Sequence, residues 1–184
     1  NAPVGGMVDG LRGVYVTHAN ISNTMTAGSV VISGTGADVG LGSHGVEFGG
    51  GAVLQGGSIQ VTGTGGGTDG SGIYDGNSAT LNTIGNPGNV FTQSIQIQGT
   101  STNMGTGGDG VSLTNGRTII HGTADPITIR GQAANGLGLG DVAINNPGGT
   151  VDLEVGSIGG QIASLGSITT PVSYTHLTLP TNGT

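Results

Sequence analysis

The chain has 184 residues, of which 42 are Gly, and Lys and Arg together number only 3. So much Gly excludes an ordinary helical domain, because each Gly in a helix interior costs about 1 kcal/mol relative to Ala. A collagen is excluded as well, since the Gly residues follow no strict triplet. A mean hydropathy of +0.10 argues against a charged disordered tail. The composition therefore predicts a Gly-rich, all-β, extracellular protein.

A net charge of −7 argues against nucleic acid as a partner. Binding to a phosphate backbone requires clustered Lys and Arg, whereas Arg12, Arg117 and Arg130 are scattered along the sequence. The absence of Cys excludes a disulfide framework and a thiolate metal site. No apolar run reaches the length of about 18 residues that a bilayer requires, so we expect no transmembrane segment.

In chain order, the sequence repeats a segment of β-forming residues followed by Gly or a Gly-Thr pair. The four copies are GSVVISGTG from Gly28, GSIQVTGTG from Gly57, QSIQIQGTS from Gln93 and PITIRGQAA from Pro126. Alignment on Val30, Ile59, Ile95 and Ile127 gives spacings of 29, 36 and 32 residues. Self-similarity at such a period predicts a stacked repeat architecture.

A second short strand is predicted after each of these segments, and a third, weaker strand closes each repeat. The second strands are Gly13–Val16 from an earlier repeat, Gly45–Phe48, Gly72–Asp75, Gly110–Leu113 and Asp141–Ile144. The third strands are Ala52–Leu54, Ala79–Leu81, Thr118–Ile120 and Val151–Leu153. Three short strands per repeat, separated by turns, are typical of a coil that stacks on its neighbours.

Apolar and polar residues alternate within the strands, as in Ser58–Thr62 and Ser94–Gln98. Coils stacked about 4.8 Å apart would lay Ile on Ile in a continuous internal column. We expect Gly at the coil corners, where left-handed backbone conformations recur. The sequence predicts a right-handed parallel β-helix of about five irregular coils over residues 1–170. The alternative is a β-sandwich, whose strands usually pair as hairpins.

Residues 171–184 do not continue the repeat. Within them, Val172–Thr181 contains no Gly and resembles a translated sequencing-library adapter. We therefore expect a non-repeat tail that is either artefactual or disordered, with no function for Tyr174 or His176. On this interpretation the natural protein continues beyond Ile168, and both ends of the chain are cuts in a longer protein.

The GSVxIxGTG segments, the second strands and the near-absence of Lys and Cys are found over about Val14 to Ile168. This pattern resembles the filamentous-haemagglutinin-like and autotransporter-type passengers, which are large β-helical bacterial exoproteins. The resemblance implies secretion through an outer-membrane partner, a location outside the cell or on its surface, and a role in adhesion. It implies no catalytic residues.

The acidic residues are the main candidates for catalysis. A β-helical enzyme that degrades pectin-like polysaccharides needs several Asp close together, and a lyase also needs an Arg or Lys base. The best such group is Asp109, Asp141 and Arg117. Most Asp residues here flank Gly, as Asp69 and Asp75 do, and we interpret them as turn residues.

Metal binding has weaker candidates. Gly107–Leu113 has the glycines of a Ca²⁺-binding β-roll repeat, with Asp109 as a candidate ligand, but Ser112 stands at an expected ligand position and no second copy follows. The residues His18, His44 and His121 lie in different repeats without i, i+4 spacing. We expect them to be exposed turn residues.

We therefore expect a non-catalytic structural and adhesive segment of a secreted bacterial surface protein, without a cofactor. Its expected partners are host or environmental glycans or cell-surface proteins, contacted by outward rows of Thr, Ser, Asn and Gln. Two alternatives stay open. One is a polysaccharide lyase or glycoside hydrolase built on the β-helix, and the other is an ice-binding surface, which requires regular Thr-x-Thr rows.

Overall fold

The computed structural model describes residues 10–23, 28–76, 79–83, 94–102, 108–114, 118–122, 125–133, 135–156, 162–169 and 175–178. For residues 79–83, 163–165 and 175–178 it describes the backbone alone. The described residues form strands joined by turns and contain no helix. It follows that none of them belongs to a helix that is long and apolar enough to cross a bilayer.

The described strands form two sheets, and every pairing between them is parallel. The larger sheet has two arms that join in β13 (Leu137–Asn145), to which β15 (Ile162–Thr169) also pairs. The first arm stacks β1 (Val14–Val16), β4 (Val46–Phe48), β7 (Ile73–Asp75) and β10 (Val111–Ser112). The second arm stacks β2 (Asn20–Ser22), β5 (Ala52–Gly56), β8 (Ala79–Thr83) and β11 (Thr118–His121). The smaller sheet stacks β3 (Ser29–Thr35), β6 (Ser58–Gly65), β9 (Ile95–Ser101), β12 (Ile127–Gln132), β14 (Val151–Val155) and β16 (Thr175–Thr178).

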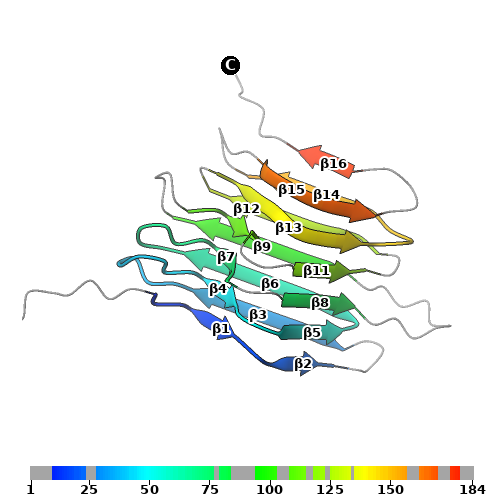
Figure 1. Ribbon diagram of the computed structural model, residues 1–184, viewed down its shortest axis with the longest axis horizontal. Coiled ribbons are helices and arrows are strands. Elements are labelled where there is room, and N and C mark those ends of the chain that lie inside the picture. Colours follow the sequence, from blue (N-terminus) through cyan, green and yellow to red (C-terminus); the bar gives the residue numbers. More distant parts are fainter. Residues whose placement is uncertain are drawn as a thin grey trace, which may run out of the picture.

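We call one passage of the chain through the first arm, the second arm and the smaller sheet a tier. Strands β4, β5 and β6 form one tier, and β7, β8 and β9 form the next. Figure 1 shows the tiers stacked from β1 and β2 at the bottom of the view to β16 at the top. This all-β arrangement of parallel strands is compatible with a parallel β-solenoid. The hairpin pairing expected for a β-sandwich is not found among the described strands.

The register of the smaller sheet confirms the alignment of the repeats. Val30 pairs with Ile59, Ile59 with Ile95, and Ile95 with Ile127, at the predicted spacings. These side chains are buried, and the stack continues with Val151 of β14. Alternation within each strand therefore lays one aliphatic side chain on the next through five tiers.

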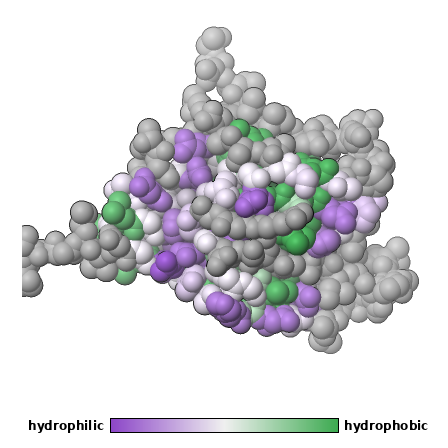
Figure 2. Space-filling view, viewed as in Figure 1, coloured by the Kyte–Doolittle hydropathy of each residue, from purple (hydrophilic) through white to green (hydrophobic). Residues whose placement is uncertain are grey.

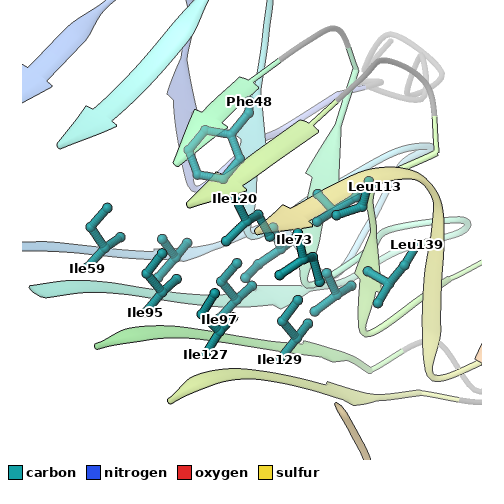
Figure 3. Packing of buried hydrophobic residues seen from close by; sticks show 14 of the residues in the cluster. Phe48, Ile59, Ile73, Ile95, Ile97, Leu113, Ile120, Ile127, Ile129 and Leu139 are labelled. Carbon is teal, nitrogen blue, oxygen red and sulfur yellow. The ribbon is translucent and has the colours of Figure 1, made fainter. Parts of the chain in front are cut away.

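The two arms of the larger sheet supply the core side chains that pack against those of the smaller sheet. Their buried residues include Phe48, Ile73, Leu113, Ile120 and Leu139. Figure 3 shows these side chains gathered against the isoleucines of β6, β9 and β12. Because each arm supplies a row of apolar side chains in every tier, the core is continuous along the stack.

The prediction was wrong in the fifth tier. The segment Asp141–Ile144, predicted as a second strand, lies in the second arm, where Val142 pairs with Thr118. The first arm at this level is the beginning of β13, where Leu137 pairs with Val111. Strand β13 passes through both arms without an intervening loop. This tier therefore contains fewer residues than the repeats before it, and an alignment at their spacing misplaces its strands.

The same shortening displaces the next predicted strand. Val151–Leu153, predicted as the third strand of its repeat, forms part of β14 in the smaller sheet, where Val151 pairs with Ile127. A sixth tier follows, built from β15 and β16, whereas about five were expected. Its strand β16 falls in residues 171–184 and pairs with β14. The origin of that segment stays a prediction.

Glycines line the corner between the ends of β3, β6, β9 and β12 and the start of the tier that follows each of them. Gly34, Gly63, Gly99 and Gly131 are paired in register, one above the other. A Cβ on any of them would lie well under 3.0 Å from a backbone carbonyl oxygen of the following glycine column, which consists of Gly45, Gly72, Gly110 and Gly136. The backbones at this corner touch directly, and no side chain larger than hydrogen fits between them.

This finding changes the explanation of the repeated glycines. Among the described glycines, a positive φ is found at Gly10, Gly40, Gly42, Gly51, Gly67 and Gly136. With the exception of Gly136, the two corner columns adopt ordinary backbone conformations. Their repetition is therefore required by the close approach of two backbones, and the left-handed corners that the sequence suggested account for few of them.

Replacing Ile97 by Ala is expected to lower the free energy of unfolding by about 2–5 kcal/mol, because it leaves a cavity between Val61 and Ile129. The outward neighbour Gln96 provides the control, since Gln96→Ala should change the free energy of unfolding by less than about 0.5 kcal/mol. Urea denaturation followed by circular dichroism measures both. Equal losses of stability in the two variants would contradict the placement of Ile97 in the core.

Replacing Gly99 by Ala is expected to cost about 3 kcal/mol or more, because the added Cβ overlaps the carbonyl oxygen of Gly110. The matched variant is Gly51→Ala, at a site with a φ of +75° and no atom within 4 Å of an added Cβ. That variant should lose only the cost of a left-handed backbone, about 1–2 kcal/mol. A smaller loss for Gly99→Ala than for Gly51→Ala in the same urea experiment would refute the close-contact explanation.

Candidate functional site

Three outward side chains of the first arm form a row across the first three tiers. Parallel pairing places Tyr15 beside Glu47, and Glu47 beside Tyr74. Their strand neighbours, such as Val46 and Phe48, point into the core, so the alternation of the strand directs these three side chains outward. We call this set the Tyr–Glu–Tyr row.

Arg12 holds the middle of the Tyr–Glu–Tyr row. Its Nε donates a hydrogen bond to Oε2 of Glu47 in an ion pair, and its guanidinium lies over the ring of Tyr15, 4.8 Å from the centroid. The Arg12 side chain is 38% exposed, whereas that of Glu47 is only 7% exposed. The guanidinium therefore compensates a nearly buried carboxylate and contacts an exposed aromatic ring at the same time.

His44 supports the other end of the row. Its ring stacks on Tyr74 with centroids 4.0 Å apart and an angle of 2° between the planes. Its Nδ1 accepts a hydrogen bond of 3.0 Å from the backbone N–H of Ser71. The expectation that His44 is an exposed turn residue was wrong, because it is buried in this stack.

Part of this group lines a shallow hollow of about 570 Å³, which does not include Tyr15. Its lining residues are Gly10, Arg12, Leu41, Gly42, His44, Glu47, Tyr74 and Gly76. The glycines leave room in front of the carboxylate: an added Cβ on Gly76 would lie 3.3 Å from Oε1 of Glu47. The hollow therefore brings together an aromatic ring, a guanidinium and the edge of a nearly buried carboxylate within one small area.

The ionisation of these groups favours recognition over proton transfer. Burial, with Glu47 and Asp75 nearby, raises the pKa of Tyr74, so its hydroxyl stays protonated at neutral pH. The hydrogen bond to Glu47 raises the pKa of Arg12, which stays charged. Burial lowers the pKa of His44, which favours its neutral form. None of these three shifts brings a group toward the neutral pKa that suits a general acid or base, since the pKa of His44 moves further below neutrality, and its Nδ1 is already engaged by Ser71.

The structure does not bring the predicted catalytic residues Asp109 and Asp141 side by side. Asp109 precedes β10, whereas the backbone N–H of Asp141 donates to the carbonyl of Leu113, beyond the other end of β10. That separation along the strand is roughly 13 Å. Asp141 is exposed and lines a hollow of about 200 Å³ with Ser167, and Arg117 lies outside the described residues.

Two other aspartates differ in environment although both precede Gly. Asp69 is an exposed turn residue with a φ of +58°, as the sequence predicts. Asp75 is not a turn residue: it lies in β7, fully buried, and accepts a hydrogen bond from the hydroxyl of Thr118. In the part of the chain that the structure describes, no three His, Cys, Asp or Glu residues are placed to hold a metal ion together.

The Tyr–Glu–Tyr row is not among the predicted sites, although the sequence contains the necessary signal. The predicted second strands Gly13–Val16, Gly45–Phe48 and Gly72–Asp75 align with each other. Their third residues are Tyr15, Glu47 and Tyr74, so the alignment alone puts them in one row. Arg12 and His44 lie just before their strands, and only the folded turns show that they join the row.

Comparison with models of protein families, with curated proteins and with solved structures finds no match for this chain. The resemblance to β-helical bacterial exoproteins therefore stays a prediction from the repeat pattern.

Stability is expected to fall as the pH drops below the ordinary His pKa of 6.5, because burial gives His44 a lower pKa in the folded state. The stability contributed by the neutral ring is complete above this value and is lost as the pH falls through the folded-state pKa. Glu47 opposes this shift and Arg12 reinforces it. Urea midpoints at about pH 7.5 and about pH 5.5 measure the loss.

The matched variant for this measurement is His44→Gln, which keeps a hydrogen-bond acceptor and cannot titrate in this range. All other His residues are common to both proteins. The variant should lose less stability between the two pH values than the parent chain does. An equal loss in both would show that His44 is not the responsible group.

Proposed function

We propose that the chain is a right-handed parallel β-helix that serves as a structural, adhesive segment of a secreted bacterial surface protein, without catalytic activity. The observation that supports this most directly is the register of the smaller sheet. There the same aliphatic positions and the same glycine corner repeat in every tier from β3 to β12. A core and a corner that repeat unchanged suit a rod, in which each tier contacts only its neighbours.

The direction of the hydrogen bonds supports a mechanical role. Parallel pairing between tiers directs the backbone hydrogen bonds from one tier to the next, along the direction of stacking. Strands β3 and β6 alone are paired at seven positions. Separating two tiers by pulling along the stack would require many of these hydrogen bonds to break together, so the arrangement resists extension.

The outward face of the smaller sheet is polar and carries few charges. Its rows include Gln60 stacked on Gln96, and Thr64 stacked on Thr100. Amide ladders of this kind stabilise stacked strands. Figure 2 shows the described surface in one view as a mixture of hydrophilic and intermediate residues, with hydrophobic residues in separate patches. Such a surface offers many hydrogen-bond donors and acceptors to a glycan or a protein partner.

Handedness and location rest on general rules and on the resemblance. A crossover between parallel strands of one sheet is right-handed in nearly all proteins, which supports the right-handed β-helix. Secretion, a location on the bacterial cell surface and an outer-membrane partner are implied by the resemblance to filamentous-haemagglutinin-like and autotransporter-type passengers. A chain without Cys suits passage across an envelope in the unfolded state.

The alternatives receive less support from the geometry. A polysaccharide-degrading enzyme needs its carboxylates close together, whereas Asp109 and Asp141 lie near opposite ends of β10. An ice-binding face needs regular Thr rows on both outward positions. Beside the row that contains Thr64 and Thr100, the neighbouring row changes from Thr62 to Gln98.

The test combines an adhesion assay with an enzyme assay. Beads coated with the full chain should be retained under flow on surfaces that carry immobilised glycans or epithelial cell-surface proteins, more than beads coated with Gly99→Asp. That variant should not form the stack, because the added side chain overlaps Gly110. Incubation with polygalacturonate, xylan and β-glucan should produce neither new reducing ends nor unsaturated sugar products.

The two assays separate the hypotheses. Retention that is lost in Gly99→Asp, without cleavage, supports the structural and adhesive role. Cleavage of any of the three polysaccharides would support the enzyme alternative. Equal retention of the parent chain and the variant would contradict an adhesive role for the folded stack.

A further inference from the structure

We propose that the hollow at the Tyr–Glu–Tyr row binds a neutral saccharide unit through its ring face and a pair of adjacent hydroxyls. This inference rests on the proposed adhesive function and assigns it a definite site. Three features of the hollow support it: exposed aromatic surface, a guanidinium–carboxylate pair, and space in front of that pair.

The aromatic surface is suited to the ring of a sugar. Tyr74 is half-buried and lines the hollow. Tyr15 is 51% exposed and lies beside the hollow rather than in its lining, on the other side of the Arg12 guanidinium. The two tyrosines are two tiers apart, about 10 Å, with Glu47 between them. A pyranose ring presents apolar C–H groups on its faces and hydroxyls at its edge. It can therefore lie on an aromatic surface while its hydroxyls reach the polar group beside it.

The polar group in the middle is suited to two neighbouring hydroxyls. Oε2 of Glu47 is engaged by Nε of Arg12, while Oε1 lies next to Gly76 at the hollow. Oε1 can accept a hydrogen bond from one hydroxyl. In the guanidinium, Nη1 donates to the carbonyl oxygen of Gly10 at 3.4 Å, and Nη2 can donate to the next hydroxyl. A donor and an acceptor held side by side can bind two adjacent hydroxyl groups, of which one donates a hydrogen bond and the other accepts one.

The charges favour a neutral ligand over a charged one. An anionic ligand would face Glu47 within a chain of net charge −7, which is unfavourable. A cationic ligand would compete with Arg12, which already pairs with the carboxylate and occupies a face of Tyr15. Neutral hydroxyl groups can add to the existing ion pair without displacing either member.

The site is rigid before any ligand arrives. Glu47 is 5% exposed and fixed by Arg12, and the ring of Tyr74 is fixed by the parallel stack with His44. A ligand therefore needs to order few side chains, which reduces the entropic cost of binding. The main chain on both sides of Glu47 belongs to paired strands, so the spacing of the row is set by the register.

The experiment uses the full chain with ¹³C-labelled tyrosine, because the sequence contains only three Tyr residues and no Trp. Four neutral hexasaccharides serve as probes: the β-1,4-glucan, the α-1,4-glucan, the β-1,4-mannan and the N-acetylated chitin oligomer. At least one should shift the signals of Tyr15 and Tyr74 and leave that of Tyr174 unchanged, with a dissociation constant at or below about 1 mM. Oligogalacturonate and chitosan, the anionic and cationic probes, should bind at least about tenfold more weakly.

Variants test whether the site is the row itself. Tyr15→Ala removes an exposed side chain and should weaken binding about tenfold without loss of folding. Glu47→Gln should weaken it similarly, by removing the charged acceptor. The matched control is Glu154→Gln, which alters the exposed pair between Glu154 and Arg130 and should leave binding unchanged. The tyrosine spectrum of each variant checks that the fold is retained.

The outcomes decide the inference separately from the proposed function. If none of the four neutral probes shifts Tyr15 and Tyr74, or if Tyr15→Ala binds as well as the parent chain, the saccharide site is refuted. Stronger binding of a charged probe refutes the neutral ligand class. The bead assay tests the adhesive function independently: retention without a shift of Tyr15 and Tyr74 would leave that function supported and place its contact elsewhere.

Discussion

The rest of the structure depends on direct contact between two backbones at one corner of the first four tiers. Gly34, Gly63, Gly99 and Gly131 meet the following glycine column at distances that exclude a side chain. This contact closes one corner of the core, while aliphatic side chains and Phe48 fill the rest of it. Because the corner accepts only Gly and the inward column of the smaller sheet is aliphatic, neighbouring repeats satisfy both conditions in a single alignment. The register of the strands follows from that match.

The register in turn creates the surface features. Once Val46 and Ile73 are fixed inside the core, the residues that follow them must point outward, since strand side chains alternate. Glu47 and Tyr74 therefore become neighbours although 27 residues separate them along the chain. The ion pair with Arg12 then offsets the cost of a nearly buried carboxylate. A stack with a repetitive interior can in this way display a distinct group of side chains across three neighbouring tiers.

Polar residues inside the stack occur where two elements meet at a corner. Asp75 and Thr118 share a hydrogen bond within the core, and Asn146 is fully buried at the end of β13. The amide nitrogen of Asn146 donates to the carbonyl oxygens of Asp125 and Thr150, both at 2.9 Å. These bonds join the turns that precede β12 and β14, and the carbonyl oxygen of Thr150 also accepts the backbone N–H of Ile127 in β12.

The sequence by itself determined the all-β class, the positions of the inward aliphatic residues and the spacing of the first four repeats, because alternation and self-similarity are local signals. It also contained the alignment of Tyr15, Glu47 and Tyr74. Tertiary structure alone decided that the corner glycines serve close contact, that His44 is buried, and that β13 runs through both arms. These features depend on which backbones meet across the cross-section and on how many residues each tier needs. Neither the contact between distant backbones nor the number of residues in a tier can be read from the residue pattern within a single repeat.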